Sequence, residues 1–189
     1  MHQSSNILIP YQFNSHLSPQ ELKFKQSFVD TVSPYFKSGD YALTVTYKSY
    51  HNYPSNFDST HNIQTNSDLN YLKYCLDFKH YMNCINRKFL GTAKCKSQSL
   101  NAVFGIEHSM NEGTHFHIIL EAPPTDLIPK SNHVRELTDL WVGMKRTGNA
   151  KGTCIIECFD SDGWLRYMFK EITENNTPRY DSTYWRLPK

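Results

Sequence analysis

The sequence predicts an α+β domain in which a central antiparallel β-sheet is flanked by helices. Two segments with strand-like alternation, 102–108 and 115–121, are separated by a short polar turn, which is typical of an antiparallel hairpin. Segments with helical spacing lie between the strands in the order α β α β β α β α, which favours an α+β fold. Apolar residues make up 39% of the 189 residues, so we expect one core and a single domain over 1–189.

The first third of the chain is expected to contain one helix and one strand. Residues 1–16 show no periodicity and are interpreted as an irregular arm. Ser18 begins a capping-box pattern, which predicts a helix over 19–36. Residues 41–48 are β-branched and aromatic with clean alternation, so they predict a strand. The polar residues 49–66 predict a long loop.

The second helix is expected to begin at Ser67 or Asp68, which are both N-cap residue types, and to end near Gly91. A basic polar loop over 92–100 follows and leads into the hairpin. The remainder is expected to contain a helix capped by Ser131 or Asn132, a basic loop over 145–151, a strand over 152–159, a helix from Asp160 or Ser161 to about Asn175, and an irregular tail over 176–189.

Composition excludes several classes of protein. No run of 18 apolar residues occurs, so no transmembrane helix is predicted. The N-terminus lacks the charged-then-apolar order of a signal peptide. The five cysteines are an odd number without paired metal-binding spacings, which favours a reducing compartment. We therefore expect a cytoplasmic protein without a membrane segment, and the net charge of +2 indicates no particular partner.

The pair His115 and His117 is the most informative feature of the predicted hairpin. Residues two apart on a strand share a face, so both imidazoles project from one side, about 7 Å apart along the strand. Folding the hairpin brings Glu107 beside them, whereas His108 alternates to the other face and ranks second as a ligand. Two histidines and one carboxylate suit Mn²⁺ or Mg²⁺, with open positions for phosphate oxygens and water, and do not demand zinc. The alternative interpretation is two ordinary strand histidines.

Tyr167 and Lys170 form a second pair, on the last predicted helix. Residues three apart are neighbours on a helix surface, and Tyr167 falls outside the apolar stripe that contains Trp164 and Phe169. A cation beside a tyrosine favours the phenolate, so Tyr167 is a candidate nucleophile. The alternative interpretation is an exposed tyrosine that packs on its neighbours.

Three motifs in this order resemble those of HUH endonucleases of the single-tyrosine replication-initiator type. The first is a strand of Leu-Thr-hydrophobic character, here Leu43-Thr44-Val45-Thr46-Tyr47. The second is His115-Phe116-His117, with the acidic Glu107 on the preceding strand. The third is Tyr167-Met168-Phe169-Lys170 on a later helix. Together these motifs span about residues 40–172.

This resemblance implies a nickase and strand-joining enzyme that acts on single-stranded DNA at an origin or hairpin. A divalent metal on Glu107, His115 and His117 would polarise the scissile phosphate. Tyr167 would attack the phosphorus, leaving a 5′-phosphotyrosine and a free 3′-OH, and Lys170 would help to position the reacting groups. The expected role is initiation of rolling-circle replication, with host replication proteins or a helicase as partners.

Several residues are expected to contact the DNA. Lysine and arginine side chains in loops next to the strands can follow a phosphate backbone. We assign DNA binding to Thr44 and Thr46 of the first motif and to the basic residues Lys94, Lys96, Lys145, Arg146 and Lys151. A solvated basic loop is the alternative interpretation of each cluster.

Three other functions remain open at this point. The stretch His115–Pro124 also resembles HUH transposases, although those usually have a glutamine after the tyrosine in place of the Tyr-x-x-Lys pattern. The second alternative is a non-enzymatic DNA-binding protein with the same fold. The third is a metal-dependent hydrolase that uses water as the nucleophile. No second tyrosine lies three or four residues from Tyr167, which disfavours the two-tyrosine variant. No phosphate-binding glycine-rich loop occurs, so we expect no helicase domain.

Overall fold

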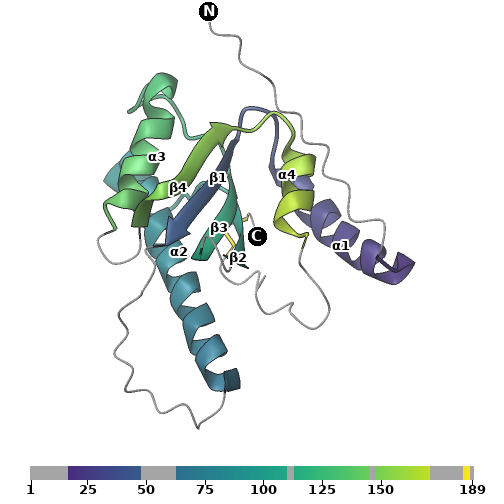
Figure 1. The fold of residues 1–189 in the computed structure, drawn as a ribbon. Helices are drawn as coiled ribbons and strands as arrows, with labels where there is room; N and C mark the ends of the chain where they lie inside the picture. The colour runs from purple at the N-terminus through teal and green to yellow at the C-terminus, as the bar shows by residue number, and fades with distance from the viewer. Residues whose placement is uncertain (1–16, 48–62, 110–112, 145–147, 171–184, 188–189) are drawn as a thin grey trace, which may run out of the picture.

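The computed structural model describes residues 17–47, 63–109, 113–144, 148–170 and 185–187. These residues form an α+β fold with a four-stranded antiparallel sheet, which confirms the predicted fold class (Figure 1). The strand order is β2-β3-β1-β4, so β3 and β1 are the central strands. The strands are β1 (Tyr41–Tyr47), β2 (Ala102–Ser109), β3 (Gly113–Leu120) and β4 (Gly148–Glu157).

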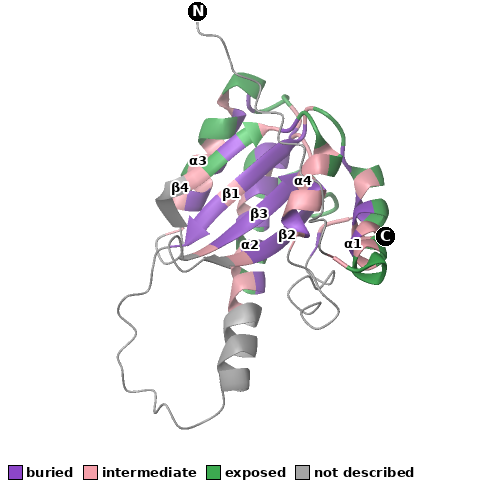
Figure 2. Cartoon of the chain, turned by 45° about the vertical axis from the view of Figure 1, so that its right-hand side comes forward, coloured by how far each residue is buried: buried purple, intermediate pink, exposed green. Residues whose placement is uncertain are grey.

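The helices cover both faces of this sheet. They are α1 (Pro19–Val32), α2 (Ile63–Lys94), α3 (His133–Val142) and α4 (Ser161–Met168), with short 3₁₀ turns η1 (Ser33–Tyr35) and η2 (Lys130–Asn132). Phe116 of β3 contacts Phe78 of α2 and Trp141 of α3, which places both helices on one face. His117, its neighbour on β3, contacts Trp164 of α4 on the opposite face. The central strands β1 and β3 are therefore largely buried on both sides, whereas β4 exposes Ile156 (Figure 2).

The predicted first helix corresponds to α1 followed by η1. Ser18 accepts a hydrogen bond from the Glu21 backbone N–H, and the Glu21 carboxylate accepts one from the Ser18 backbone N–H, as the capping-box pattern predicts. The regular helix ends at Val32, and Pro34 lies in the following 3₁₀ turn. The helix is thus shorter than predicted because a proline interrupts the main-chain hydrogen-bond pattern.

The second helix is longer than the sequence predicts at both ends. It begins at Ile63, before Ser67 and Asp68, because N-cap residue types are also tolerated in a first or second turn. Gly91 has a φ of 77° and breaks the regular helix where its end was expected. A further turn continues to Lys94, so the start of the predicted 92–100 loop is helical.

The last strand and the last helix also differ from prediction. β4 begins at Gly148 instead of 152, because Gly148 and Asn149 pair with the end of β1 across a register shift between Thr44 and Thr46. The Asp160 side chain caps α4 as expected, but the helix ends at Met168. The predicted end at Asn175 lies outside the described residues.

The ends of the chain are described only in part. The predicted arm over 1–16 lies outside the described residues, as does most of the tail. Within the tail, Arg186 forms a β-bridge with Ala102, so this position is not irregular. Among the described residues, no helix has both the length and the apolar character required to cross a membrane.

Candidate metal and nucleophile site

Glu107, His115 and His117 converge because of the register of the β2–β3 hairpin. Glu107 lies directly opposite His115, and His117 is two residues further along β3 on the same face. Phe116, between the histidines, points into the core and is fully buried. We call Glu107, His115 and His117 the strand half of the site.

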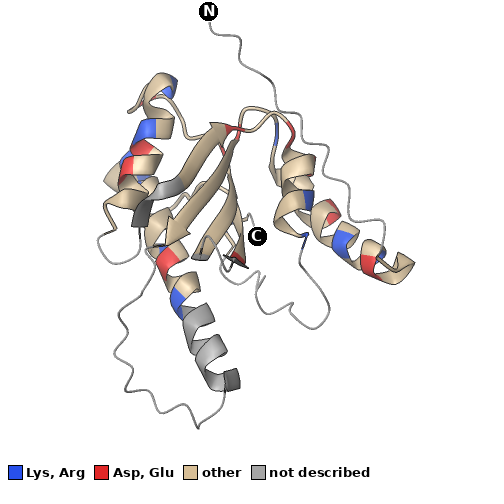
Figure 3. Ribbon diagram, viewed as in Figure 1, with Lys and Arg blue, Asp and Glu red and all other residues tan. Residues whose placement is uncertain are grey.

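The ligand atoms of the strand half lie within 4.8 Å of one another, so the cluster could hold a metal ion. Glu107 Oε2 is 2.8 Å from His117 Nε2 and 3.5 Å from His115 Nε2. Both histidines are buried, whereas the Glu107 side chain is 18% exposed. Figure 3 shows that the charged residues gather on the helices and that the coloured part of the sheet is largely uncharged, so a carboxylate on β2 is unusual there.

Hydrogen bonding and burial hold Glu107 and His117 in the protonation states that metal ligands need. A hydrogen bond from His117, followed by contact with Lys170, lowers the pKa of Glu107 to about 2 against the opposing effect of burial. Burial lowers the pKa of His117 because it disfavours the charged imidazolium. At neutral pH the cluster therefore offers an ionised carboxylate and a neutral His117 imidazole, the forms that bind cations.

Thr44 supports His117 from the neighbouring strand. The two residues are direct partners in the β1–β3 ladder, and Thr44 Oγ1 lies 3.1 Å from His117 Nδ1. This contact fixes the ring so that Nε2 faces Glu107. The structure thus places Thr44, predicted to bind DNA, against a candidate metal ligand. Thr46, the partner of His115, is buried.

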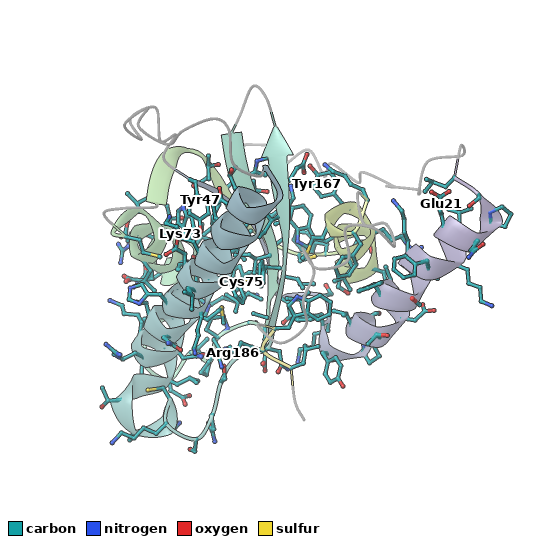
Figure 4. The ribbon with its side chains drawn as sticks, turned by 90° about the horizontal axis from the view of Figure 1, so that it is seen from below. Glu21, Tyr47, Lys73, Cys75, Tyr167 and Arg186 are labelled. Carbon is teal, nitrogen blue, oxygen red and sulfur yellow. The ribbon has the colours of Figure 1, made fainter. Side chains whose placement is uncertain are left out.

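Trp164, Tyr167 and Lys170 bring a second group of side chains to the same place, and we call them the helix half. The Tyr167 ring lies 4.8 Å from the His117 ring and is stacked on Trp164 with centroids 5.3 Å apart. Lys170 Nζ lies 2.7 Å from Glu107 Oε2 and 4.0 Å from the centre of the Tyr167 ring. Seen from below, Tyr167 lies beside the strands on the α4 side, across the sheet from Tyr47 and Lys73 (Figure 4).

Lys170 lies in a turn after α4 instead of on the helix itself. Its backbone N–H donates to the Tyr167 carbonyl at 3.1 Å, so the two residues stay close although the helix has ended. Burial lowers the pKa of Lys170, but contacts with Glu107 and Tyr167 raise this pKa by more, so the net shift is upward. The ammonium is therefore a lasting positive charge between the candidate ligand and the candidate nucleophile.

Helix α1 holds the end of α4 through polar side chains. The buried Lys25 ammonium donates to the backbone carbonyl of Lys170. Arg166 donates to Gln26 one turn earlier along α4. Neither Lys25 nor Trp164 was among the site residues predicted from the sequence. Lys25 lies on the same face of α1 as the buried Val29 and Val32. A lysine on the apolar face of a helix could have been recognised from the sequence as a candidate buried polar contact.

Trp164 positions the helix half on the sheet. Its Nε1 donates to the Ile118 carbonyl at 2.9 Å, which ties α4 to β3 one residue beyond His117. Its ring also contacts the His117 ring, with centroids 5.5 Å apart. The sequence placed Trp164 in the apolar stripe, and only the contact with β3 reveals its place beside Tyr167.

Among the described residues, the basic side chains that were predicted to bind DNA do not lie at this site. Lys94 and Lys96 are exposed and precede the start of β2, whereas Glu107 is about 17 Å further along that strand. Lys94 also pairs with Asp126 at 3.4 Å. Lys145 and Arg146 lie outside the described residues. Lys151 belongs to β4, and its side chain is not among those described, which is also true of His108, the second-ranked ligand.

Comparisons with known proteins identify no relative. No protein-family model matches the chain, and searches of curated proteins and of solved structures find no significant match. The feature that bears on function is the site itself, a potential metal-binding cluster with a tyrosine and a lysine in direct contact with it.

Proposed function

We propose that this protein is a metal-dependent endonuclease for single-stranded DNA, of the HUH type, in which Tyr167 is the nucleophile. The observation that carries the proposal is the contact between the two halves of the site. Tyr167 packs on the candidate ligand His117, and Lys170 bridges from Glu107 to the Tyr167 ring. These groups come from segments about 50 residues apart in the sequence, which an isolated His-x-His or Tyr-x-x-Lys pattern does not require.

The donor set of the strand half fits a divalent cation such as Mn²⁺ or Mg²⁺. One ionised carboxylate and two imidazoles provide three ligands, which leaves positions for a phosphate oxygen and water. A bound cation supplies Lewis-acid polarisation of the scissile phosphate. Thr44 and the β1–β3 ladder hold His117 in the orientation that binding needs.

The helix half supplies the nucleophile and holds it. The Tyr167 hydroxyl loses its proton as Oη forms a bond to phosphorus. The bond from phosphorus to the 3′-oxygen breaks, and that oxygen takes up a proton and leaves as a 3′-OH, so no net proton is gained or lost. The phosphodiester energy is retained in the 5′-phosphotyrosine, so the reverse reaction can join strands. The Lys170 ammonium stabilises negative charge on the tyrosine oxygen, while Trp164 and His117 fix the plane of its ring.

Initiation of rolling-circle replication is the biological role that we favour for this chemistry. A single nucleophilic tyrosine suffices to nick one strand and provide a 3′-OH primer. The DNA partner would be a single-stranded origin or hairpin, and host replication proteins or a helicase would follow the nick.

A covalent-adduct assay tests the proposal directly. Labelled single-stranded oligonucleotides, with and without hairpins, are incubated with the protein and Mn²⁺ and separated on a denaturing protein gel. We expect a labelled protein band that requires Mn²⁺ and disappears in Tyr167→Phe. The matched control is Tyr35→Phe, because Tyr35 is an exposed tyrosine on η1.

Two outcomes would overturn this proposal. Cleavage that persists in Tyr167→Phe without an adduct would indicate water as the nucleophile. Binding of the oligonucleotides without any cleavage, across a randomised library, would indicate a DNA-binding protein without nuclease activity.

A further inference from the structure

A single carboxylate oxygen, Glu107 Oε2, has three candidate partners in this site. His117 Nε2 lies 2.8 Å from it, Lys170 Nζ 2.7 Å and His115 Nε2 3.5 Å. Two of these atoms belong to candidate metal ligands, and the third carries a permanent positive charge. The lysine therefore contacts the oxygen that completes the metal-binding cluster.

An ammonium and a divalent cation at the same carboxylate disfavour each other. Both are attracted to the negative charge of Glu107, and the two positive charges repel each other at short range. The Lys170 side chain is 17% exposed, so water screens this repulsion only in part. Lysine is thus an unexpected neighbour if the site is built only for tight metal binding.

We propose that Lys170 competes with the metal for Glu107, and that metal binding shifts the ammonium from Glu107 toward the Tyr167 hydroxyl. Under this proposal the lysine lowers metal affinity and links occupation of the metal site to the environment of the tyrosine. The competition concerns the metal site alone, whereas its catalytic consequence rests on the proposed function.

The surroundings of Lys170 allow its head group to move while its backbone stays in place. The backbone carbonyl of Lys170 accepts a hydrogen bond from the buried Lys25, and its N–H donates to the Tyr167 carbonyl. Its ammonium already lies 4.0 Å from the centre of the Tyr167 ring, so the shift is short. Lysine suits this exchange because its ammonium is a compact charge on a flexible stem.

Direct Mn²⁺ titration without DNA, by calorimetry, tests the competition. We expect Lys170→Met to bind Mn²⁺ at least about tenfold more tightly than the wild type, because the competing charge is gone. Lys170→Arg retains the charge and should stay within about threefold of the wild type. The matched control is Lys130→Met, which removes a lysine paired with a different carboxylate, Glu157, at 2.8 Å. That control should leave Mn²⁺ affinity unchanged.

An unchanged or weaker affinity in Lys170→Met would overturn the proposal, as would an equal gain in Lys130→Met, which would indicate a general charge effect. These results do not depend on nuclease activity. Tighter Mn²⁺ binding in Lys170→Met, together with no adduct in the wild type, would support the competition and reject the proposed nuclease. Circular dichroism of each variant establishes that it is folded.

Discussion

The two halves of the candidate site are held by different kinds of interaction. The strand half is fixed by the hydrogen-bond ladders of β2, β3 and β1, which set the register of Glu107, His115 and His117. The helix half is held by side chains, namely Trp164 on the Ile118 carbonyl and Lys25 on the Lys170 carbonyl. An aromatic cluster of Phe28, Phe169 and Trp185 packs behind it, with ring centroids 5.6 to 6.4 Å apart.

This difference has consequences for stability and for function. Backbone ladders in the centre of a sheet open only when much of the fold opens, so the two histidines of the strand half, on the central strand β3, are expected to share the stability of the core. Side-chain contacts between helices can be removed one at a time. Substitutions around the helix half should therefore misplace Tyr167 and Lys170 while leaving the metal-binding cluster intact.

The largest effect is expected beneath the strand half, at Phe116. Its side chain is fully buried and contacts Tyr47, Phe104 and Trp141. Phe116→Ala should lower the free energy of unfolding by about 3–5 kcal/mol, through lost burial and the cavity it leaves. Urea unfolding measures this change. The control Phe159→Ala, at a side chain that is 74% exposed, should stay within about 0.5 kcal/mol.

Removal of one ligand should separate metal binding from folding. His115→Ala is expected to weaken Mn²⁺ binding at least about 100-fold, which exceeds the loss typical of an outer-shell partner. Calorimetric titration measures this affinity, and thermal unfolding without Mn²⁺ checks that the fold persists. His80→Ala, at an exposed histidine of α2, should bind Mn²⁺ as the wild type does. Equal affinity in the two variants would place the metal elsewhere.

Substitution of Thr44 tests whether its hydroxyl orients the candidate ligand His117. Thr44→Val removes the hydroxyl that contacts His117 Nδ1 and retains the β-branched shape, so we expect Mn²⁺ affinity to fall about 10- to 100-fold. Thr44→Ser restores a hydroxyl and should recover most of the affinity. If valine and serine bind Mn²⁺ equally well, the hydroxyl does not support the ligand.

The smallest effect on the metal site is expected at Lys25, on the helix-half side. Lys25→Met leaves the Lys170 carbonyl without this donor, and we expect adduct formation to slow by about tenfold because the tyrosine and lysine are misplaced. Mn²⁺ affinity should not fall, and a misplaced Lys170 that no longer competes for Glu107 should raise it at most as far as Lys170→Met does. Lys23→Met, at an exposed position of α1, is the control. A large loss of Mn²⁺ affinity in Lys25→Met would mean that the two halves are not independent.

Local patterns were sufficient to predict the strand half. Alternation along 115–121 places both histidines on one face, and the hairpin turn sets which residue of the preceding strand lies opposite them. The predicted neighbours Glu107 and His115 are direct partners in the ladder. These relations span few residues and depend on backbone geometry alone, so the order of residue types determines them.

Local patterns were less reliable where an element ends. Tyr167 and Lys170 were expected on one helix that continues to about Asn175, but α4 ends at Met168 and Lys170 lies in the following turn. The strand β4 begins four residues before its predicted start because it pairs with β1 across a register shift. The ends of helices and strands depend on residues that are distant in the sequence, and the periodicity of a segment does not indicate which residues those are.

The residue order alone therefore specifies the α+β class, the capping box of α1 and the pairing of Glu107 with the two histidines, because each follows from periodicity or capping within a short segment. Only tertiary packing decides that α4 lies on the histidine face of the sheet, that Thr44 meets His117 and that Lys25 reaches the Lys170 carbonyl. Those contacts join segments about 50 to 150 residues apart, and burial of the shared core selects them over other arrangements.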